Sequence, residues 1–261
     1  MTSVGVLASG RGSNFRAIVD HRGLNVLTGV EIGVLLYNYA DAPVATIAEE
    51  YGIPARLVEH RDRSRLEFET EIVETLGSYG IELVCLAGWD RIIGSEFFSK
   101  YRWRIMNIHP ALLPAFGEKG LNADFVHEAV LQYGAKVTGC SVYFIDVSVE
   151  KGPIILQKPV EIREREISLF PTSRRESVEI LSDRVLMQEH RLYSKAIQLY
   201  AEGRLQIRES VSELENSTRR VVFVDADDNW EKEWTRKQQP FLEHQRELWA
   251  SNKSVTSRDL L

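Results

Sequence analysis

An asparagine and a histidine stand two residues apart in the stretch NIHPALLP, residues 107–114. Side chains of an extended segment alternate in direction, so Asn107 and His109 are expected to point to the same side. Pro110 biases His109 toward extended geometry. An amide donor beside an imidazole suits a developing oxyanion together with proton movement, as in acyl or formyl transfer. The residues alone leave open a second interpretation, a capped loop with a hydrogen-bonded core histidine.

A glycine-rich turn, SGRGSN at residues 9–14, joins the apolar run VGVLA to the helical pattern FRAIVD. Gly10 and Gly12 permit backbone angles that other residues avoid, and Ser13 or Asn14 is expected to cap the helix. The free N–H groups and the helix dipole then favour an anion such as phosphate. The alternative is an ordinary tight strand–helix turn. The third glycine of the dinucleotide-binding fingerprint is absent from SGRGSN.

Other catalytic chemistries find little support in the sequence. A serine hydrolase is not indicated, since there is no G-x-S-x-G motif. The histidines lack metal-ligand spacing, and no metal is predicted. Cys85 and Cys140 lie in apolar runs, so we expect buried free thiols.

Alternating strand and helix patterns indicate how these loops are positioned. We predict an α/β fold, a mostly parallel twisted sheet with helices on both faces. Ligands bind such sheets beyond the carboxyl ends of the strands, where residues 9–14, 88–93 and 107–114 fall. The strands expected up to this point are residues 4–8, 30–38, 53–58, 81–88 and 102–108, and the helices are 41–52, 64–79 and 89–100.

The second half of the chain is expected to continue with a helix near 122–134 and a hairpin of strands 136–146 and 154–162. Ser173-x-x-Glu176 is a capping-box signature and predicts the start of a long helix that ends at Gly203. RLQI is expected to be a short last strand, VSELENSTRR a polar linker and VVFVD an edge strand. We therefore divide the chain into residues 1–207 and a C-terminal extension, 208–261, that packs on the main domain or on a second subunit.

Composition and charge exclude several classes of partner. The net charge of -6 argues against a general binder of nucleic acid or membrane surfaces. The sequence shows neither a signal-peptide pattern nor an apolar run of membrane-spanning length. We expect a soluble cytoplasmic protein with small-molecule substrates, and a homodimer is left open.

Six segments together resemble the glycinamide ribonucleotide (phosphoribosylglycinamide) formyltransferases, the folate-dependent enzymes of purine synthesis. They occur in the order of that family and cover roughly residues 3–207. The segments are VLASGRGSNFRAI, LAGWDRII, MNIHPALLPAF, KVTGCSVYF, KGPIILQ and QEHRLYSKAIQLYAEGRL.

The resemblance implies a formyltransferase (Rossmann-like) fold and a role for each matching position. Asn107, His109 and Glu150 would be catalytic. Gly12, Ser13 and Asn14 would hold the substrate phosphate, and Glu189 would bond the ribose hydroxyls. The co-substrate 10-formyltetrahydrofolate would be bound by Arg65, Trp89, Asp90, Arg91, Ile92, Ile93, Phe98, Val147, Ser148 and Val149.

The implied reaction is attack of the glycinamide amine on the formyl carbon. Asn107 and protonated His109 would donate to the oxyanion, and the carboxylate at position 150 would keep His109 charged. Three departures from the family pattern stand near this site. Glu150 replaces aspartate, Tyr143 stands where histidine is common, and Asp90 stands where methionine is common.

These departures keep three alternatives open. The first is a related formyltransferase acting on another amine, such as an amino sugar. The second is a formyltetrahydrofolate hydrolase. The third is a weakly active or non-catalytic folate-binding homologue, because a shift of about 1 Å in a catalytic group can cost about a hundredfold in rate.

Overall fold

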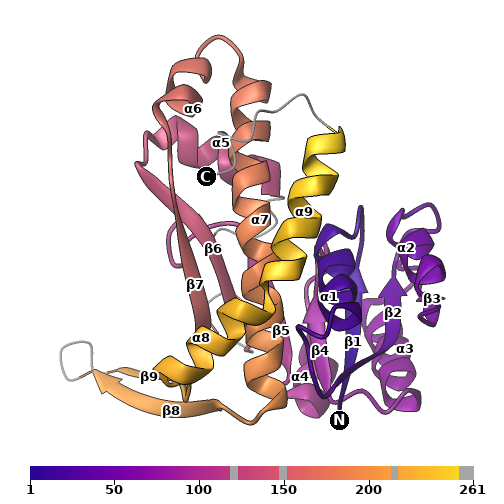
Figure 1. The fold of residues 1–261 in the computed structure, drawn as a ribbon. Coiled ribbons are helices and arrows are strands. Elements are labelled where there is room, and N and C mark those ends of the chain that lie inside the picture. Colours follow the sequence, from indigo (N-terminus) through magenta and orange to yellow (C-terminus); the bar gives the residue numbers. More distant parts are fainter. Residues whose placement is uncertain (118–122, 147–151, 213–216, 253–261) are drawn as a thin grey trace.

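The computed structural model describes residues 1–117, 123–146, 152–212 and 217–252. Within these ranges, seven strands form one sheet in the order β3-β2-β1-β4-β5-β6-β7 (Figure 1). The first five strands along the chain run parallel, whereas β6 pairs antiparallel with both β5 and β7. The strands are β1 Thr2–Ala8, β2 Val30–Tyr37, β3 Ala55–Leu57, β4 Leu83–Leu86, β5 Ile105–His109, β6 Val137–Phe144 and β7 Ile154–Glu161. The predicted α/β fold with a mostly parallel sheet is confirmed.

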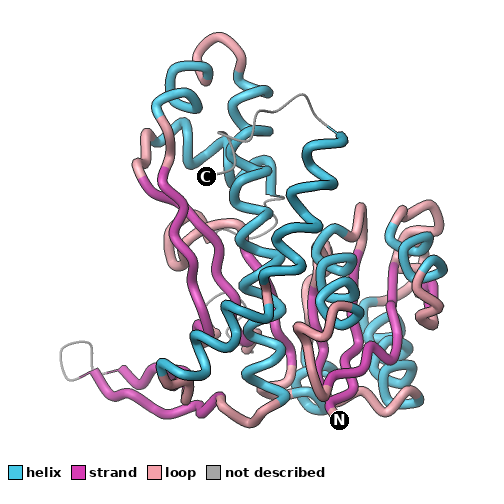
Figure 2. The backbone as a smooth tube through the Cα atoms, in the orientation of Figure 1, coloured by secondary structure: helices cyan, strands magenta, loops and turns pink. Residues whose placement is uncertain are grey.

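Helices cover both faces of this sheet, as predicted (Figure 2). On one face, side chains of α1, α2, α5 and α7 join the larger hydrophobic core. On the other face, α3 and α4 form a second core with side chains such as Leu7 and Val34. The helices are α1 Ser13–Gly23, α2 Val44–Glu50, α3 Arg65–Ser78, α4 Ser95–Tyr101, α5 Ala123–Tyr133, α6 Glu164–Leu169 and α7 Arg174–Ala201. None of the helices in the described ranges has the length and apolar character needed to cross a membrane.

The predicted helix over residues 89–100 is wrong in its first half. Residues 89–94 form a loop, and α4 begins only at Ser95. The loop remains irregular because the side chain of Asp90 bonds to groups outside the segment, among them Ser9 Oγ. Polar anchoring of this kind competes with helix formation.

Two predicted helix caps also differ from the structure. Gly12 is the N-cap of α1, and neither Ser13 nor Asn14 caps it with a side chain. Ser173 is the N-cap of α7 as expected, but no side-chain cap bond accompanies it. The sequence pattern therefore located the starts of both helices. The side-chain cap hydrogen bonds that it predicted are not formed.

The strands predicted at RLQI and VVFVD fall largely within two observed strands, whereas the polar linker predicted for VSELENSTRR is wrong where the structure describes it. β8 (Leu205–Ser212) and β9 (Ser217–Val224) pair antiparallel in a separate two-stranded sheet. α8 (Asp228–Lys237) and α9 (Gln239–Asn252) follow, with Pro240 in the first turn of α9. Trp234 and Phe241 are buried within the larger core of the main sheet. The extension is therefore part of the folded body, and the domain boundary at residue 207 stays a prediction.

Candidate active site

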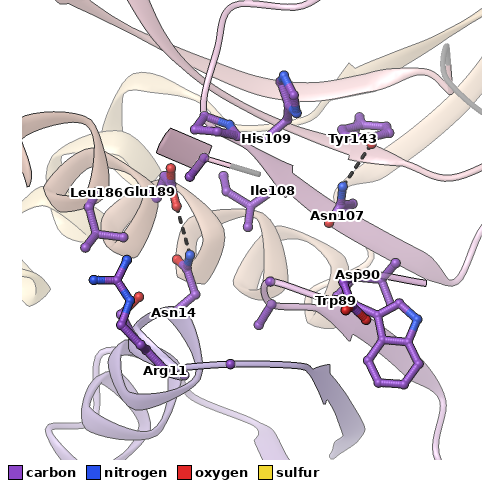
Figure 3. Close-up of a pocket in the computed structure, with 18 of the residues that line it drawn as sticks. Arg11, Asn14, Trp89, Asp90, Asn107, Ile108, His109, Tyr143, Leu186 and Glu189 are labelled. Atoms are coloured by element: carbon purple, nitrogen blue, oxygen red, sulfur yellow. Dashed lines mark hydrogen bonds between the residues drawn. The ribbon is translucent and has the colours of Figure 1, made fainter. Parts of the chain in front are cut away.

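Asn107 and His109 lie at the carboxyl end of β5, as their spacing predicted. Both side chains line one cleft of about 460 Å³. The strand places Asn107 opposite Tyr143 of β6, and Asn107 Nδ2 donates to the Tyr143 hydroxyl at 2.9 Å (Figure 3). An amide nitrogen has two hydrogens, so this bond fixes the amide plane and leaves one N–H to donate to a ligand.

The imidazole of His109 is held by the loop that follows β5. Its Nε2 lies 2.8 Å from the carbonyl oxygen of Phe116. A carbonyl only accepts, so Nε2 carries a proton and Nδ1 is the second titrating position. Burial lowers the pKa of His109, and the hydrogen bond to Phe116 opposes that shift. Within the described residues the imidazole therefore favours its neutral form, and a charged ring needs a carboxylate close by.

Ser141 anchors the loop after His109. Its hydroxyl donates to the carbonyl of Ala111 at 2.7 Å and accepts from the N–H of Leu113 at 3.0 Å. Gln157 Nε2 reaches both Leu113 O and the Ser141 hydroxyl at 2.9 Å. The antiparallel strands β6 and β7 thereby hold the irregular segment that positions the imidazole of His109.

The glycine-rich turn closes the opposite wall of the cleft. Gly12 has a φ of 76°, and a Cβ there would lie 2.5 Å from Cγ2 of Val44. Only glycine meets both conditions without strain. Because no side chain caps α1, its first N–H groups remain available to an anion.

Asn14 and Glu189 meet in this wall although they are 175 residues apart. Asn14 Nδ2 donates to Glu189 Oε2 at 2.8 Å (Figure 3). Burial raises the pKa of Glu189, and the bond from Asn14 partly offsets it. Asn14 Oδ1 is buried without a hydrogen-bond partner among the described residues. Both residues line the cleft, and the carboxylate of Glu189 is an acceptor that suits a ligand with neighbouring hydroxyls.

The loop after β4 forms a third wall, and Asp90 organises it. Its carboxylate accepts hydrogen bonds from Ser9 Oγ, Asn38 Nδ2, Tyr39 OH and Arg91, at 2.6 to 3.2 Å. Burial alone would raise the pKa of Asp90, but these bonds together lower it to about 2. The loop from 89 to 93 is thus tied to the ends of β1 and β2. The carboxylate of Asp90 is therefore engaged by neighbouring residues although its side chain is 40% exposed.

The structure brings together most of the predicted site residues. Those lining the cleft are Gly12, Ser13, Asn14, Trp89, Asp90, Arg91, Ile92, Ile93, Asn107, His109 and Glu189. Arg65 and Phe98 are not part of this lining: Arg65 pairs with Glu69, and Phe98 is buried in the second core. Val147, Ser148, Val149 and Glu150 lie outside the described residues. The ligand roles of all these positions stay predictions.

Several lining residues were missed by the sequence reasoning, among them Arg11, His127 and Leu186. Arg11 stands between the two glycines of the turn, which is the signal that could have identified it. His127 lies on α5, and burial, with a smaller electrostatic contribution from the nearby His109, lowers its pKa to about 4. Leu186 precedes Glu189 by three residues on α7, so helical spacing places both on one face.

Comparisons with known proteins agree with this geometry. The formyl transferase family matches residues 2–197. The phosphoribosylglycinamide formyltransferase of Escherichia coli (strain K12) is 34% identical over 211 residues, 80% of this chain and 92% of that protein. The trifunctional purine biosynthetic protein adenosine-3 of Homo sapiens is 39% identical over 209 residues. That match covers 79% of this chain but 19% of the human protein, so the chain spans about a fifth of its length.

A solved structure agrees as well. Glycinamide ribonucleotide transformylase 1 from Symbiobacterium toebii superposes with a TM-score of 0.73 at 36% identity, covering 86% of this chain and 94% of that one. With the family match, the E. coli relative and this superposition in agreement, the chain belongs to the formyl transferase family and, within it, to the phosphoribosylglycinamide formyltransferases.

Proposed function

We propose that the protein transfers a formyl group from 10-formyltetrahydrofolate to the amine of 5'-phosphoribosylglycinamide, in de novo purine biosynthesis. One observation carries this function. A single cleft combines an uncapped helix N-terminus, the Asn14–Glu189 pair and the Asn107–His109 pair. An anion site, a diol site and an oxyanion site in that arrangement match a phosphorylated riboside with a reacting amine. The names of the E. coli and S. toebii relatives support the same substrate.

Gly12, Ser13 and Asn14 bind the phosphate of the acceptor through the N-terminus of α1. The helix dipole and the free N–H groups favour the dianion there. Glu189 accepts hydrogen bonds from the ribose hydroxyls, and Asn14 Nδ2 holds its carboxylate in place. The acceptor is thereby held at both its phosphate and its sugar, and its amine is directed toward the end of β5.

The opposite side of the cleft fits an aromatic ligand such as the pterin of a folate. Its lining includes the apolar side chains Leu86, Ile92, Ile93 and Ile145. Ile92 is 56% exposed there, and covering it with a flat ring would remove apolar area from water. Trp89 stacks on Phe68, with 6.0 Å between ring centroids, and keeps this wall rigid. Val147, Ser148, Val149, Arg65 and Phe98 are proposed as further folate contacts from the family resemblance.

The chain catalyses the transfer by positioning and by fixed dipoles. Bound 10-formyltetrahydrofolate supplies the formyl carbon, which the acceptor amine attacks. The free N–H of Asn107 and a proton on His109 stabilise the oxygen of the tetrahedral adduct as it gains charge. The C–N bond to the folate N10 then breaks as the amine loses a proton and N10 gains one. No covalent enzyme intermediate is needed.

The charge of His109 links this mechanism to Glu150. Burial favours neutral His109, so a second proton at Nδ1 requires a negative neighbour. The family resemblance assigns that role to Glu150, and we propose it as the carboxylate that charges His109 and helps move the amine proton toward N10. Glutamate is longer than aspartate by one methylene, so the loop that carries it would need to compensate.

Release of tetrahydrofolate tests the function. The wild-type protein is mixed with 10-formyltetrahydrofolate and with 5'-phosphoribosylglycinamide, an amino sugar phosphate, or no acceptor. Turnover only with the ribonucleotide is expected. Asn107→Ala should lower kcat by about 10²–10³, as for loss of one oxyanion donor. Glu150→Gln should lose most activity, and Glu150→Asp should retain it. Equal turnover without acceptor would identify a hydrolase, and no turnover with both ligands bound would overturn the proposal.

A further inference from the structure

The helix α9 contacts the two helices that carry the proposed acceptor site. It runs beside α7 and α1 in Figure 1. Phe241, 1% exposed, stacks on His21 of α1 with 3.6 Å between ring centroids. Gln245, 7% exposed, lies with Nε2 2.7 Å from Nδ1 of His190 on α7. Gln238 Nε2 donates to the carbonyl of Arg191 at 3.3 Å. Helix α9, together with Gln238 directly before it, thus bridges α1 and α7.

His21 completes this bridge from the other side. Its Nδ1 lies 2.9 Å from the hydroxyl of Ser194 on α7 and 2.8 Å from the carbonyl of Ala17. His21, His190 and Ser194 are all buried. An amide N–H of Gln245 donates to His190 Nδ1, so His190 is neutral with its proton on Nε2. The three helices therefore meet through specific, uncharged hydrogen bonds in a buried interface.

The same two helices hold the acceptor pair. Asn14 lies in the first turn of α1, and Glu189 directly precedes His190 on α7. Because successive residues of a helix share one rigid backbone, the contact that fixes His190 also fixes the rotation of α7 that directs Glu189 toward Asn14. The 2.8 Å bond between Asn14 and Glu189 depends on the relative placement of α1 and α7.

We propose that α9 is a positioning element of the acceptor site. Gln245 and Phe241 hold α7 and α1 in the relation that brings Glu189 and Asn14 together for the ribose. This inference rests on the proposed function of those two residues. It gives residues 239–252 a part in substrate binding although none of the cleft's described lining residues comes from them.

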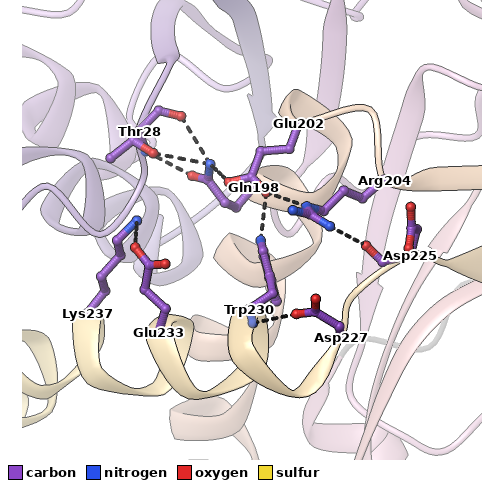
Figure 4. Close-up of polar contacts among 9 residues, drawn as sticks. All are labelled: Thr28, Gln198, Glu202, Arg204, Asp225, Asp227, Trp230, Glu233 and Lys237. Carbon is purple, nitrogen blue, oxygen red and sulfur yellow. Dashed lines mark hydrogen bonds and ion pairs between the residues drawn. The ribbon is translucent and has the colours of Figure 1, made fainter.

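The other helix of the extension provides a matched control (Figure 4). Trp230 of α8 donates through Nε1 to Glu202 Oε2 at 2.6 Å, near the end of α7. Glu202 also accepts from Gln198 and Arg204. Glu202 is roughly 20 Å along the helix from Glu189, at 1.5 Å per residue. Trp230→Phe therefore removes a docking hydrogen bond from the same extension far from the acceptor pair.

The experiment compares Gln245→Leu with Trp230→Phe in the full-length chain. Gln245→Leu loses the hydrogen bond to His190. Trp230→Phe loses the bond to Glu202 and reduces the ring that stacks on Trp234. The Tm of each variant is measured. For Gln245→Leu we expect the acceptor KM to rise roughly five- to tenfold while the folate KM and kcat stay within about twofold. Trp230→Phe should lower Tm with both KM values unchanged.

Binding of ribose 5-phosphate by calorimetry gives a readout that needs no turnover. Its Kd should rise in Gln245→Leu by the same factor as the acceptor KM and stay unchanged in Trp230→Phe. An unchanged Kd in Gln245→Leu, an equal rise in both variants, or no binding by the wild type would overturn the inference. Failure of the proposed function would be seen differently. The wild-type protein would then bind ribose 5-phosphate but release no tetrahydrofolate.

Discussion

Asn107 donates to the hydroxyl of Tyr143 across the β5–β6 pair at 2.9 Å. By the family resemblance, Tyr143 stands where histidine is common. Its hydroxyl accepts a hydrogen bond from Asn107 at the candidate site. The hydroxyl holds the amide in one orientation without using both of its N–H groups. A tyrosine at this position thus fixes the amide of Asn107, the proposed oxyanion donor, and adds no titrating imidazole near His109.

Tyr143→Phe should lower kcat by roughly fivefold to tenfold, the value of one hydrogen bond that orients Asn107, and leave both KM values within about twofold. Steady-state kinetics with each substrate varied in turn measures this. Tyr133→Phe is the control, because Tyr133 is 82% exposed. A change confined to the acceptor KM would contradict a role of Tyr143 in orienting the oxyanion donor.

Glu189→Gln should weaken acceptor binding and stabilise the fold. Burial raises the pKa of Glu189 above its ordinary value, so the folded state holds this proton more tightly than the unfolded chain. The stability linked to that proton is present at low pH and is lost as pH rises through the folded pKa. We therefore expect a higher Tm than wild type at pH 8, no gain at pH 4, and an acceptor KM at least tenfold higher.

Glu166→Gln is the control for that prediction. Glu166 is buried, as Glu189 is, but it is paired with Arg184. Loss of a paired buried carboxylate leaves the guanidinium without its partner, so Tm should fall at neutral pH. Equal Tm shifts in the two variants would contradict this prediction. They would show that burial of the Glu189 carboxylate without an ion pair does not lower the stability of the fold.

Arg11→Gln should raise the acceptor KM about fivefold at low salt and reduce its salt dependence. The exposed Arg11 lines the cleft beside the N-terminus of α1, and no ion pair engages it within the described part of the chain. A cation there attracts the phosphate dianion, and salt screens that attraction. Arg16→Gln is the control, because the Arg16 guanidinium is already paired with Glu50 at 2.7 Å. An equal effect of both variants would point to net charge alone.

The protein should lose stability as the solution is acidified below pH 6.5. Burial lowers the pKa of His21 to about 3 and that of His190 to about 4. Because the unfolded chain takes up these protons near pH 6.5, stability is complete above that pH and declines toward pH 4, by about 1.4 kcal/mol per group and pH unit. Urea unfolding at pH 7, 6 and 5 measures the decline. His190→Gln should decline less steeply, and identical slopes would contradict this origin.

Local patterns predicted most of the fold because they depend on neighbouring residues. Alternating apolar runs indicated the strands up to β7, and glycine-bounded turns indicated where the cleft would lie. Of the hairpin β8–β9, the apolar ends RLQI and VVFVD were predicted as strands, and the polar part between them was taken for a linker because its side chains resemble those of a linker. The loop at 89–94 was missed because Asp90 bonds to Ser9, Asn38 and Tyr39, which lie far from it in sequence.

The sequence by itself determined the family, the α/β architecture and the pairing of Asn107 with His109, since side chains two residues apart on a strand share a face. Only the tertiary structure decided that Glu189 meets Asn14, that Asp90 bonds to residues at the ends of β1 and β2, and that α9 bridges α1 and α7. The reason is physical. A hydrogen bond between residues 175 apart in the chain depends on how whole helices pack against a sheet, and no local spacing encodes that packing.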